Sequence, residues 1–349
     1  MREKIGNMYE NIGLPRIIII SFFLSMLAAA GPLGLSVESL LGDAIRRWAM
    51  YGILVLAMVP AVQCGIGLNF GISLGIVGGL LGATLAIEIG FSNPWVSILV
   101  AMLIGVAMGS LLGILYGMLL NRVKGSEMTV STYMGFSVIA FMNMIWLSLS
   151  FQNGDLKWPI SGKGLRNTIS LDSSFGEVFS NTWNFSIGGL NIPTGLIIFF
   201  LLTCLLVWLF MRSKVGMAMS AAGANPAFTK SSGINVNKMR ILGTALSTAL
   251  AAVGIITYAQ SYGFLQLYNA PLMMGFHSVA AILIGGATIS RAKISHVIIG
   301  AFLFQGILSV ALPVVNKLMP EGNLSDVIRI IISNGIILYA LSKTKGGNR

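Results

Sequence analysis

Long apolar runs, separated by only short polar intervals, dominate the sequence and restrict the folds available to it. Hydrophobic residues make up 55% of the 349 residues and charged residues only 9%, whereas a soluble domain carries about 25% charged residues. Backbone polar groups inside a bilayer must be hydrogen bonded within the protein, so such runs form helices. We therefore expect a single transmembrane domain over residues 1–349, an all-α, multi-pass protein of the plasma (inner) membrane.

Ten apolar segments are candidates for membrane spans. Residues 1–16 are polar and basic, and the apolar run after them could belong to a cleavable signal peptide. Every later segment is also hydrophobic, so we expect an uncleaved first span that reaches Val37 and a polar loop over residues 38–47. The expected spans are 17–37, 48–65, 68–89, 95–120, 128–150, 193–211, 238–261, 275–287, 296–312 and 326–341.

Lysine and arginine are distributed unevenly between the two sets of loops. With ten spans, fifteen of these residues fall on the side that holds both termini and six on the other side. Positive residues concentrate on the cytoplasmic side of membrane proteins. We therefore expect cytoplasmic termini (1–16 and 342–349), an extracytoplasmic loop (151–191) and a cytoplasmic segment (212–240). Topology also explains the net charge of +11, because the basic residues form no stripe that would bind nucleic acid.

The cytoplasmic segment between the sixth and seventh spans carries the signals of a short helix. Asn225 suits the N-cap, Pro226 the first helical position and Gly233 the position just past the end. Gly223 and Gly233 are expected to permit turns at the two ends, since glycine adopts positive φ without steric cost. A helix of about two turns is not stable alone in water. It therefore requires the membrane surface or a partner protein, unless the segment is an ordinary connecting loop.

Glycine-rich interruptions occur in both halves of the chain, around Gly65–Gly71 and at Gly285–Gly286. Corresponding broken helices in the two halves of a transporter mark a central pathway. Neutral polar and aromatic side chains nearby would suit a sugar or nucleoside, whereas the alternative role for each is hydrogen bonding between helices. We expect Asn69→Leu to reduce transport far more than it reduces the amount of protein. The candidate pathway residues are Gln63, Asn69, Phe70, Gly71, Ser73, Gly285 and Gly286.

Catalytic motifs are absent from the sequence. It contains no G-x-x-x-x-G-K-[ST] phosphate loop, no H-E-x-x-H and no Cys/His ligand cluster, so we expect neither an enzyme nor a bound cofactor or metal. His277 and His296 are expected to be hydrogen-bonded interface residues, with proton carriage as the alternative. Few carboxylates lie within the spans, which argues against a proton-coupled carrier. Cys64 and Cys204 are expected to be packing residues.

Three motifs resemble those of the permease subunits of ribose-type ABC importers. The segment 216–234 resembles that family's coupling segment, with Phe228 where a second alanine is usual. GLNFGISLG resembles the motif G-I-D-L-S-V-G, with Asn69 in place of the usual aspartate. ILIGGATISRAKISHVIIG resembles a later glycine-rich motif, although several glycines are absent. The residues expected to couple to an ATPase are Gly216, Ala221, Gly223, Asn225, Ala227, Phe228, Gly233 and Ile234.

The resemblance implies a permease that moves a small polar solute by alternating access. It implies three protein partners besides the lipid bilayer: a cytoplasmic ABC ATPase, a second permease subunit (identical or paralogous), and an extracytoplasmic substrate-binding protein. The alternatives are a self-sufficient secondary carrier or facilitative channel for a neutral solute, and a membrane scaffold that transports nothing.

Overall fold

The computed structural model describes residues 14–157, 164–187, 189–318 and 335. Seven helical segments in these ranges are long and apolar enough to cross a membrane, and two more, Arg16–Ala30 and Ala270–Ile284, are apolar but shorter. The prediction of a helical, polytopic membrane protein is confirmed. The tenth expected span, 326–341, lies outside the described residues except for residue 335, as do nearly all of both termini, so the count of ten is not tested.

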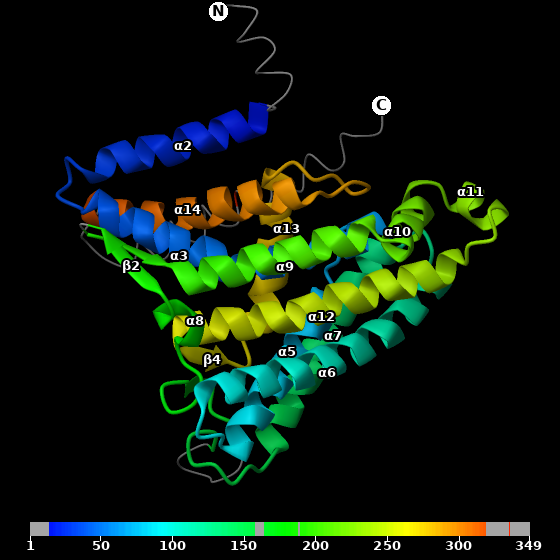
Figure 1. The fold of residues 1–349 in the computed structure, drawn as a ribbon, viewed down its shortest axis with the longest axis horizontal. Helices are drawn as coiled ribbons and strands as arrows, with labels where there is room; N and C mark the ends of the chain where they lie inside the picture. Colours follow the sequence, from blue (N-terminus) through cyan, green and yellow to red (C-terminus); the bar gives the residue numbers. More distant parts are fainter. Residues whose placement is uncertain (1–13, 158–163, 188, 319–334, 336–349) are drawn as a thin grey trace, which may run out of the picture.

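The helices and strands follow one another with short connections, apart from the long segment between α7 and α9 (Figure 1). The first helices are α2 (Leu14–Ala30), α3 (Val37–Leu56), α4 (Met58–Gln63), α5 (Ile72–Ile89), α6 (Pro94–Arg122) and α7 (Glu127–Ser148). The long segment holds β1 (Thr168–Ser170), α8 (Val178–Asn181), β2 (Asn184–Ile187) and β3 (Leu190–Pro193). The rest comprises α9 (Thr194–Arg212), α10 (Lys214–Ala224), α11 (Pro226–Ser231), α12 (Val236–Tyr262), β4 (Phe264–Gln266), α13 (Ala270–Ile284) and α14 (Ile294–Leu318).

Several expected boundaries are wrong, and a helix cap, a proline or a side-chain contact explains each. The expected loop 38–47 is helical, because the Ser36 hydroxyl caps α3 at the Ser39 amide and Arg46 bonds to a distant loop. The eighth span begins at Ala270 instead of Gly275, since Pro271 lies in the first turn, where a missing amide costs nothing. The seventh span begins at Val236 instead of residue 238, because the Asn235 side chain caps α12 at the Lys238 amide.

Small residues allow close helix packing at the centre of the bundle, where α6 packs against α5 and α12. A row of glycines along α6 allows this close packing. An added Cβ on Gly109 would lie 2.9 Å from the Thr248 carbonyl oxygen, and one on Gly113 would lie 2.8 Å from the Ala245 Cα. Larger residues on this row would separate α6 from α12. Helices in membranes associate through close backbone approach of this kind.

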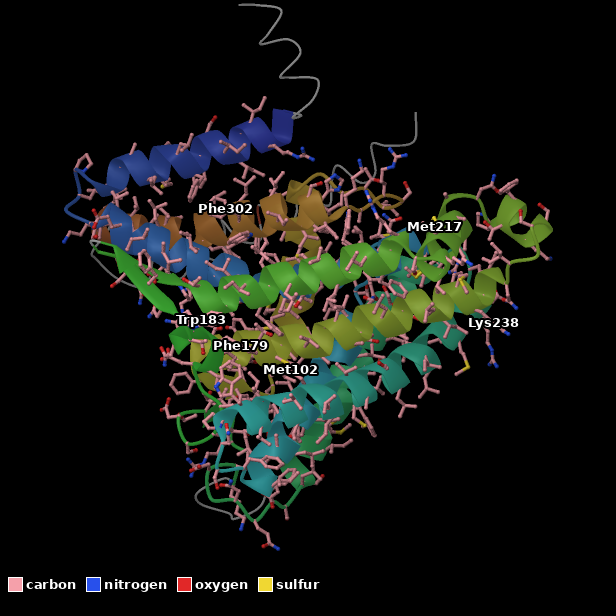
Figure 2. All side chains as sticks on the ribbon, in the orientation of Figure 1. Met102, Phe179, Trp183, Met217, Lys238 and Phe302 are labelled. Atoms are coloured by element: carbon pink, nitrogen blue, oxygen red, sulfur yellow. The ribbon has the colours of Figure 1, made fainter. Side chains whose placement is uncertain are left out.

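Polar segments gather at the two ends of the bundle (Figure 1). One end holds α8 and two small antiparallel sheets, β1–β4 and β2–β3. The opposite end holds α10, α11 and the loops after α4, α6 and α13. In Figure 2, Phe179 and Trp183 lie at the first end and Met217 and Lys238 at the second. Among the described residues, the segments expected on one side of the membrane thus lie together, which fits the predicted alternation of spans without fixing its direction.

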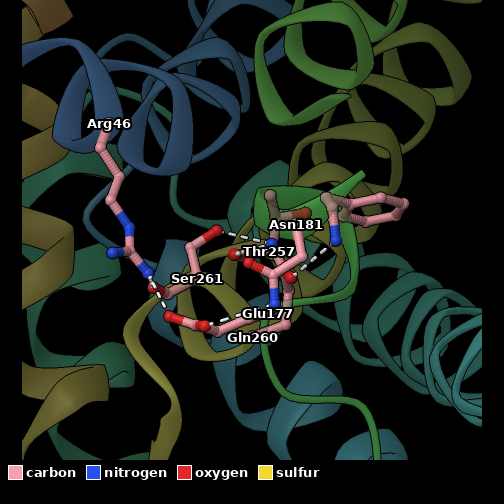
Figure 3. A network of polar contacts seen from close by, with 7 residues as sticks. Arg46, Glu177, Asn181, Thr257, Gln260 and Ser261 are labelled. Carbon is pink, nitrogen blue, oxygen red and sulfur yellow. Dashed lines mark hydrogen bonds and ion pairs between the residues drawn. The ribbon is translucent and has the colours of Figure 1, made fainter. Parts of the chain in front are cut away.

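A polar network ties the long segment to the spans at the α8 end (Figure 3). Arg46 of α3 pairs with Glu177 at 2.8 Å and donates to the Ser261 carbonyl. The side-chain oxygen of Gln260 accepts from the Phe179 amide at 3.1 Å. The backbone carbonyl of Gln260 accepts from the Glu177 amide at 2.7 Å. Gln260 is fully buried and therefore joins elements together at this end.

Candidate functional site

The segment between α9 and α12 folds into two short helices at the α10–α11 end of the bundle (Figure 1). The predicted signals around α11 are confirmed: the Asn225 side chain accepts from the Phe228 amide at 3.0 Å, Pro226 starts the helix, and Gly233 follows its end with φ +80°. The helix Pro226–Ser231 is shorter than the predicted two turns. The preceding helix, α10, was not predicted.

Most of the surface of α11 is not covered by other described residues of the chain. Thr229 is its one buried residue, and the Phe228 side chain is 66% exposed. An open groove runs beside α11 and the start of α12. Its lining includes Lys124 and Lys230 but no acidic residue; the other lining residues are Pro226, Ala227, Gly233, Ile234, Asn235, Val236 and Asn237. This surface combines an exposed aromatic ring with a positively charged, partly apolar groove.

Gly223 differs from its predicted role at a turn. It lies inside α10, and its φ is not positive. An added Cβ there would lie 2.6 Å from the Gly65 amide nitrogen and 2.9 Å from the Cys64 carbonyl carbon. Gly223 is therefore a point of close approach between the backbones of α10 and the stretch after α4.

The other predicted coupling residues lie on both sides of this contact. Gly216 packs in the first turn of α10, where an added Cβ would lie 2.5 Å from the Met211 Cα. Ala221 and Ile234 are half-buried, and Ala227 is exposed. The predicted set thus divides into residues that hold α10 to the bundle and residues that α11 presents outward.

The first glycine-rich interruption is a true break between α4 and α5, as predicted. Residues 64–71 are not helical, and Gly65 and Gly67 adopt φ of +81° and +89°. Asn69 in this break is fully buried. Its amide donates to the Ser247 hydroxyl at 2.9 Å, and its carbonyl oxygen accepts from the Tyr116 hydroxyl at 2.9 Å. Asn69 therefore joins the break to α6 and α12 and lines no open space in this conformation.

A small recess lies beside the break, between the start of α5, α7 and α13. Phe70 and Ser73 from the predicted pathway contribute to it, together with Phe136 of α7 and Phe276 of α13. The Phe276 ring lies 5.6 Å from the Phe70 ring and 6.0 Å from the Phe136 ring, measured between centroids. Thr132, Gly135, Leu272 and Gly275 complete the lining, which carries no charged side chain.

The remaining predicted pathway residues lie away from the recess. Gly71 is buried against the Tyr116 ring, and Gly285 against α14 at Gly300. Gly286, with φ +92°, is covered by the Arg16 guanidinium. Gln63 at the end of α4 donates to the Ala292 carbonyl at 2.6 Å.

An ion pair that the sequence did not predict lies near the α10–α11 end of the bundle. Arg240 of α12 pairs with Glu127 of α7 at 2.6 Å, with side chains 9% and 14% exposed. Glu127 also accepts from the Gly125 amide at 2.8 Å. The sequence did indicate that a pair could form, because a basic and an acidic residue lie at the starts of two expected spans. It could not show that these helix ends are adjacent.

Comparison with known families gives one match that covers most of the chain. Residues 40–337 match the family described as the permease component of branched-chain amino acid transport systems. No solved structure matches.

Curated relatives match over shorter stretches. A nucleoside ABC transporter permease of Lactococcus lactis is 26% identical over 174 residues, 48% of this chain and 45% of the relative. A galactofuranose transporter permease of Escherichia coli is 31% identical over 34% of this chain and 35% of the relative. A fructose import permease of Rhizobium meliloti is 30% identical over 41% of this chain and 39% of the relative. The chain therefore aligns with less than half of the length of each.

Proposed function

Since the chain belongs to the family of permease components of branched-chain amino acid transport systems, we propose that it is the membrane subunit of an ABC importer for a small neutral polar solute. It is a multi-pass protein of the plasma membrane and an ABC-type transport permease. The proposal adds the direction of transport, the class of solute and the partners.

The observation that carries the proposal is the surface formed by α11. A six-residue helix with a 66% exposed phenylalanine beside a basic groove is unstable and poorly solvated alone. A partner protein that buries Phe228 would remedy both defects. We assign this surface, within the segment 216–234, to a separate cytoplasmic ATPase. No phosphate-loop motif occurs in these 349 residues, which agrees with ATP hydrolysis by a separate subunit.

The recess beside the break supports a neutral solute. Its three phenylalanine rings offer faces for a sugar or a heterocyclic base, and the Thr132 hydroxyl offers a polar contact. The names of the relatives, which include nucleoside, galactofuranose and fructose permeases, agree with this class. We assign Phe70 and Ser73 to the solute pathway, whereas Asn69 supports it from behind.

A second permease subunit would complete the pathway. Helix α7 leaves large apolar side chains uncovered on the side of the recess, among them Leu147, which is 61% exposed, and Phe136, which is 41% exposed. A second subunit, identical or paralogous, on this face would convert the recess into an enclosed passage. An extracytoplasmic binding protein would deliver the solute at the end that holds α8 and the two sheets.

The proposed orientation follows the positive charges. Ten described Lys and Arg residues lie at the α10–α11 end and five at the opposite end, which favours a cytoplasmic α11 and ten spans with both termini inside. ATP-driven closure of the ATPase would then displace α11, and the spans would alternate the access of the recess between the two sides.

Reconstitution tests this function. The purified chain, with and without the ATPase that co-purifies with it, is placed in vesicles and assayed with panels of sugars, nucleosides and amino acids. We expect accumulation only with the ATPase and ATP, when the substrate-binding protein is also supplied. Gradient-driven transport by the chain alone would contradict the proposal and favour a self-sufficient carrier or channel.

A further inference from the structure

Movement of α11 reaches the rest of the molecule mainly through α10. Helix α11 packs against α10 and, more sparsely, against the start of α12. Helix α10 in turn packs against α9, α12 and α4. Of these neighbours, α4 leads directly into the broken stretch 64–71. The contact between α10 and this stretch is therefore the shortest route from α11 to the recess.

This contact is made by backbone atoms on both sides. Gly223 in the last turn of α10 lies against Gly65, whose own added Cβ would lie 2.8 Å from the Gly223 Cα. Gly65 adopts φ +81°, so glycine is favoured there for conformation as well as for space. No side chain at either position can change rotamer and absorb a displacement. A shift of α10 toward the break must move the break.

A displacement of Gly65 can reach the recess by two routes. Along the chain, the break carries Phe70, one wall of the recess. Across the bundle, the Gln63 side chain, two residues before Gly65, donates to the Ala292 carbonyl in the loop between α13 and α14. Helix α13 carries Phe276, the opposite wall of the recess. Both walls are thus linked to the position of α10.

We propose that the contact between Gly223 and Gly65 is the point at which movement of the coupling segment enters the solute pathway. Gly223 is then a positioning residue: it touches neither the ATPase nor the solute, but it sets the distance between α10 and the break. This inference rests on the proposed function and adds the route by which the ATPase acts.

Gly223→Ala tests the route. Ordinary contact begins near 3.4 Å, whereas the new Cβ would lie 2.6 Å from the Gly65 amide, so the two segments must separate by roughly 1 Å. The groove beside α11 does not include Gly223. We expect the variant to keep its ATPase in detergent while ATP-dependent uptake falls about tenfold, within the usual range of coupling between sites. Ala224→Ser, an exposed change in the same turn, should leave uptake unchanged.

Reagent access to the recess gives a second readout. Thr132→Cys is introduced beside Phe136, and its labelling rate is measured with and without ATP. We expect ATP to change this rate in the parent protein and to leave it unchanged when Gly223→Ala is added. If Gly223→Ala does not accumulate in membranes, Gln63→Met replaces it, since it removes the hydrogen bond to Ala292 and should also lower uptake with the ATPase bound.

The outcomes separate this inference from the proposed function. Normal uptake and a normal ATP response in Gly223→Ala, or in Gln63→Met where that variant replaces it, would overturn the inference and leave the proposed function intact. Loss of the ATPase from Gly223→Ala in membranes with normal protein amounts would also overturn it, because the contact would then serve docking. Failure of the parent protein to bind any ATPase would instead refute the proposed function.

Discussion

The ion pair between Glu127 and Arg240 can be broken by replacing either residue, and the two substitutions should destabilise the bundle by different amounts. Without Glu127, the Arg240 side chain stays 9% exposed and has no other acidic partner among the described contacts. Without Arg240, Glu127 keeps its hydrogen bond from the Gly125 amide. We expect Glu127→Gln to lower the free energy of unfolding by about 3 kcal/mol and Arg240→Met by about 2 kcal/mol, since a buried charge left unpaired is costly.

The double variant separates pairing from other effects of the substitutions. With both charges removed, the loss should be smaller than the sum of the single losses by about 2 kcal/mol, a typical coupling energy for residues in contact. The assay is reversible unfolding in mixed micelles titrated with dodecyl sulfate, followed by tryptophan fluorescence. Trp146, near the other end of α7, is fully buried, so its emission reports the unfolding of the helix that carries Glu127.

The pair between Arg46 and Glu177 serves as the matched control. It has a similar N–O distance, 2.8 Å, but its side chains are 38% and 44% exposed. Solvent screening should limit its coupling energy to about 1 kcal/mol or less. Additive losses at Glu127 and Arg240, or equal coupling energies for the two pairs, would refute the reasoning that burial makes the first pair strong.

Three further predictions concern orientation, the break and the recess. In intact cells an impermeant thiol reagent should label Ser173→Cys and not Ser231→Cys, and the reverse result would invert the proposed topology. Asn69→Leu should cost about 2 kcal/mol of stability, because it removes the hydrogen bonds that Asn69 makes with the buried hydroxyls of Tyr116 and Ser247; unchanged unfolding in detergent would argue against its bridging role. Phe136→Ala should lower uptake by about threefold to tenfold, because it loses about 1 kcal/mol of ring contact. Phe141→Ala on the same helix should leave uptake unchanged, and equal effects of the two variants would show that the recess is not part of the pathway.

Hydropathy and local helix signals predicted most of the helices. The cap at Asn225, the glycine that follows α11 and the break around Gly65–Gly71 all depend on backbone preferences that act within a few residues. The prediction of a loop at 38–47 was wrong. It rested on the polarity of Arg46 and its neighbours, but a contact with Glu177, 131 residues away, satisfies Arg46 in the middle of a helix.

The candidate site could be predicted in its residues but not in its contacts. Gly223 was identified, yet its partner is 158 positions away in the sequence, and no local preference encodes backbone approach over that separation. Asn69 was expected to face a pathway, and the structure instead surrounds it with Tyr116 and Ser247. Phe276 was missed because its two aromatic neighbours come from distant segments, Phe70 from the break and Phe136 from α7. Tertiary packing decides all three.

The central claim, that a separate ATPase docks on α11, is tested most directly by co-purification with two variants of this helix. Phe228→Asp removes the 66% exposed ring, and a buried anchor of this kind is typically worth about 2 kcal/mol or more. Gly233→Val places a β-branched residue at φ +80°, which should distort the end of the helix. We predict that both variants lose the ATPase while Ser186→Asp, in β2 at the opposite end, retains it. Full retention of the ATPase, with its substrate-stimulated hydrolysis, by both variants would contradict the account.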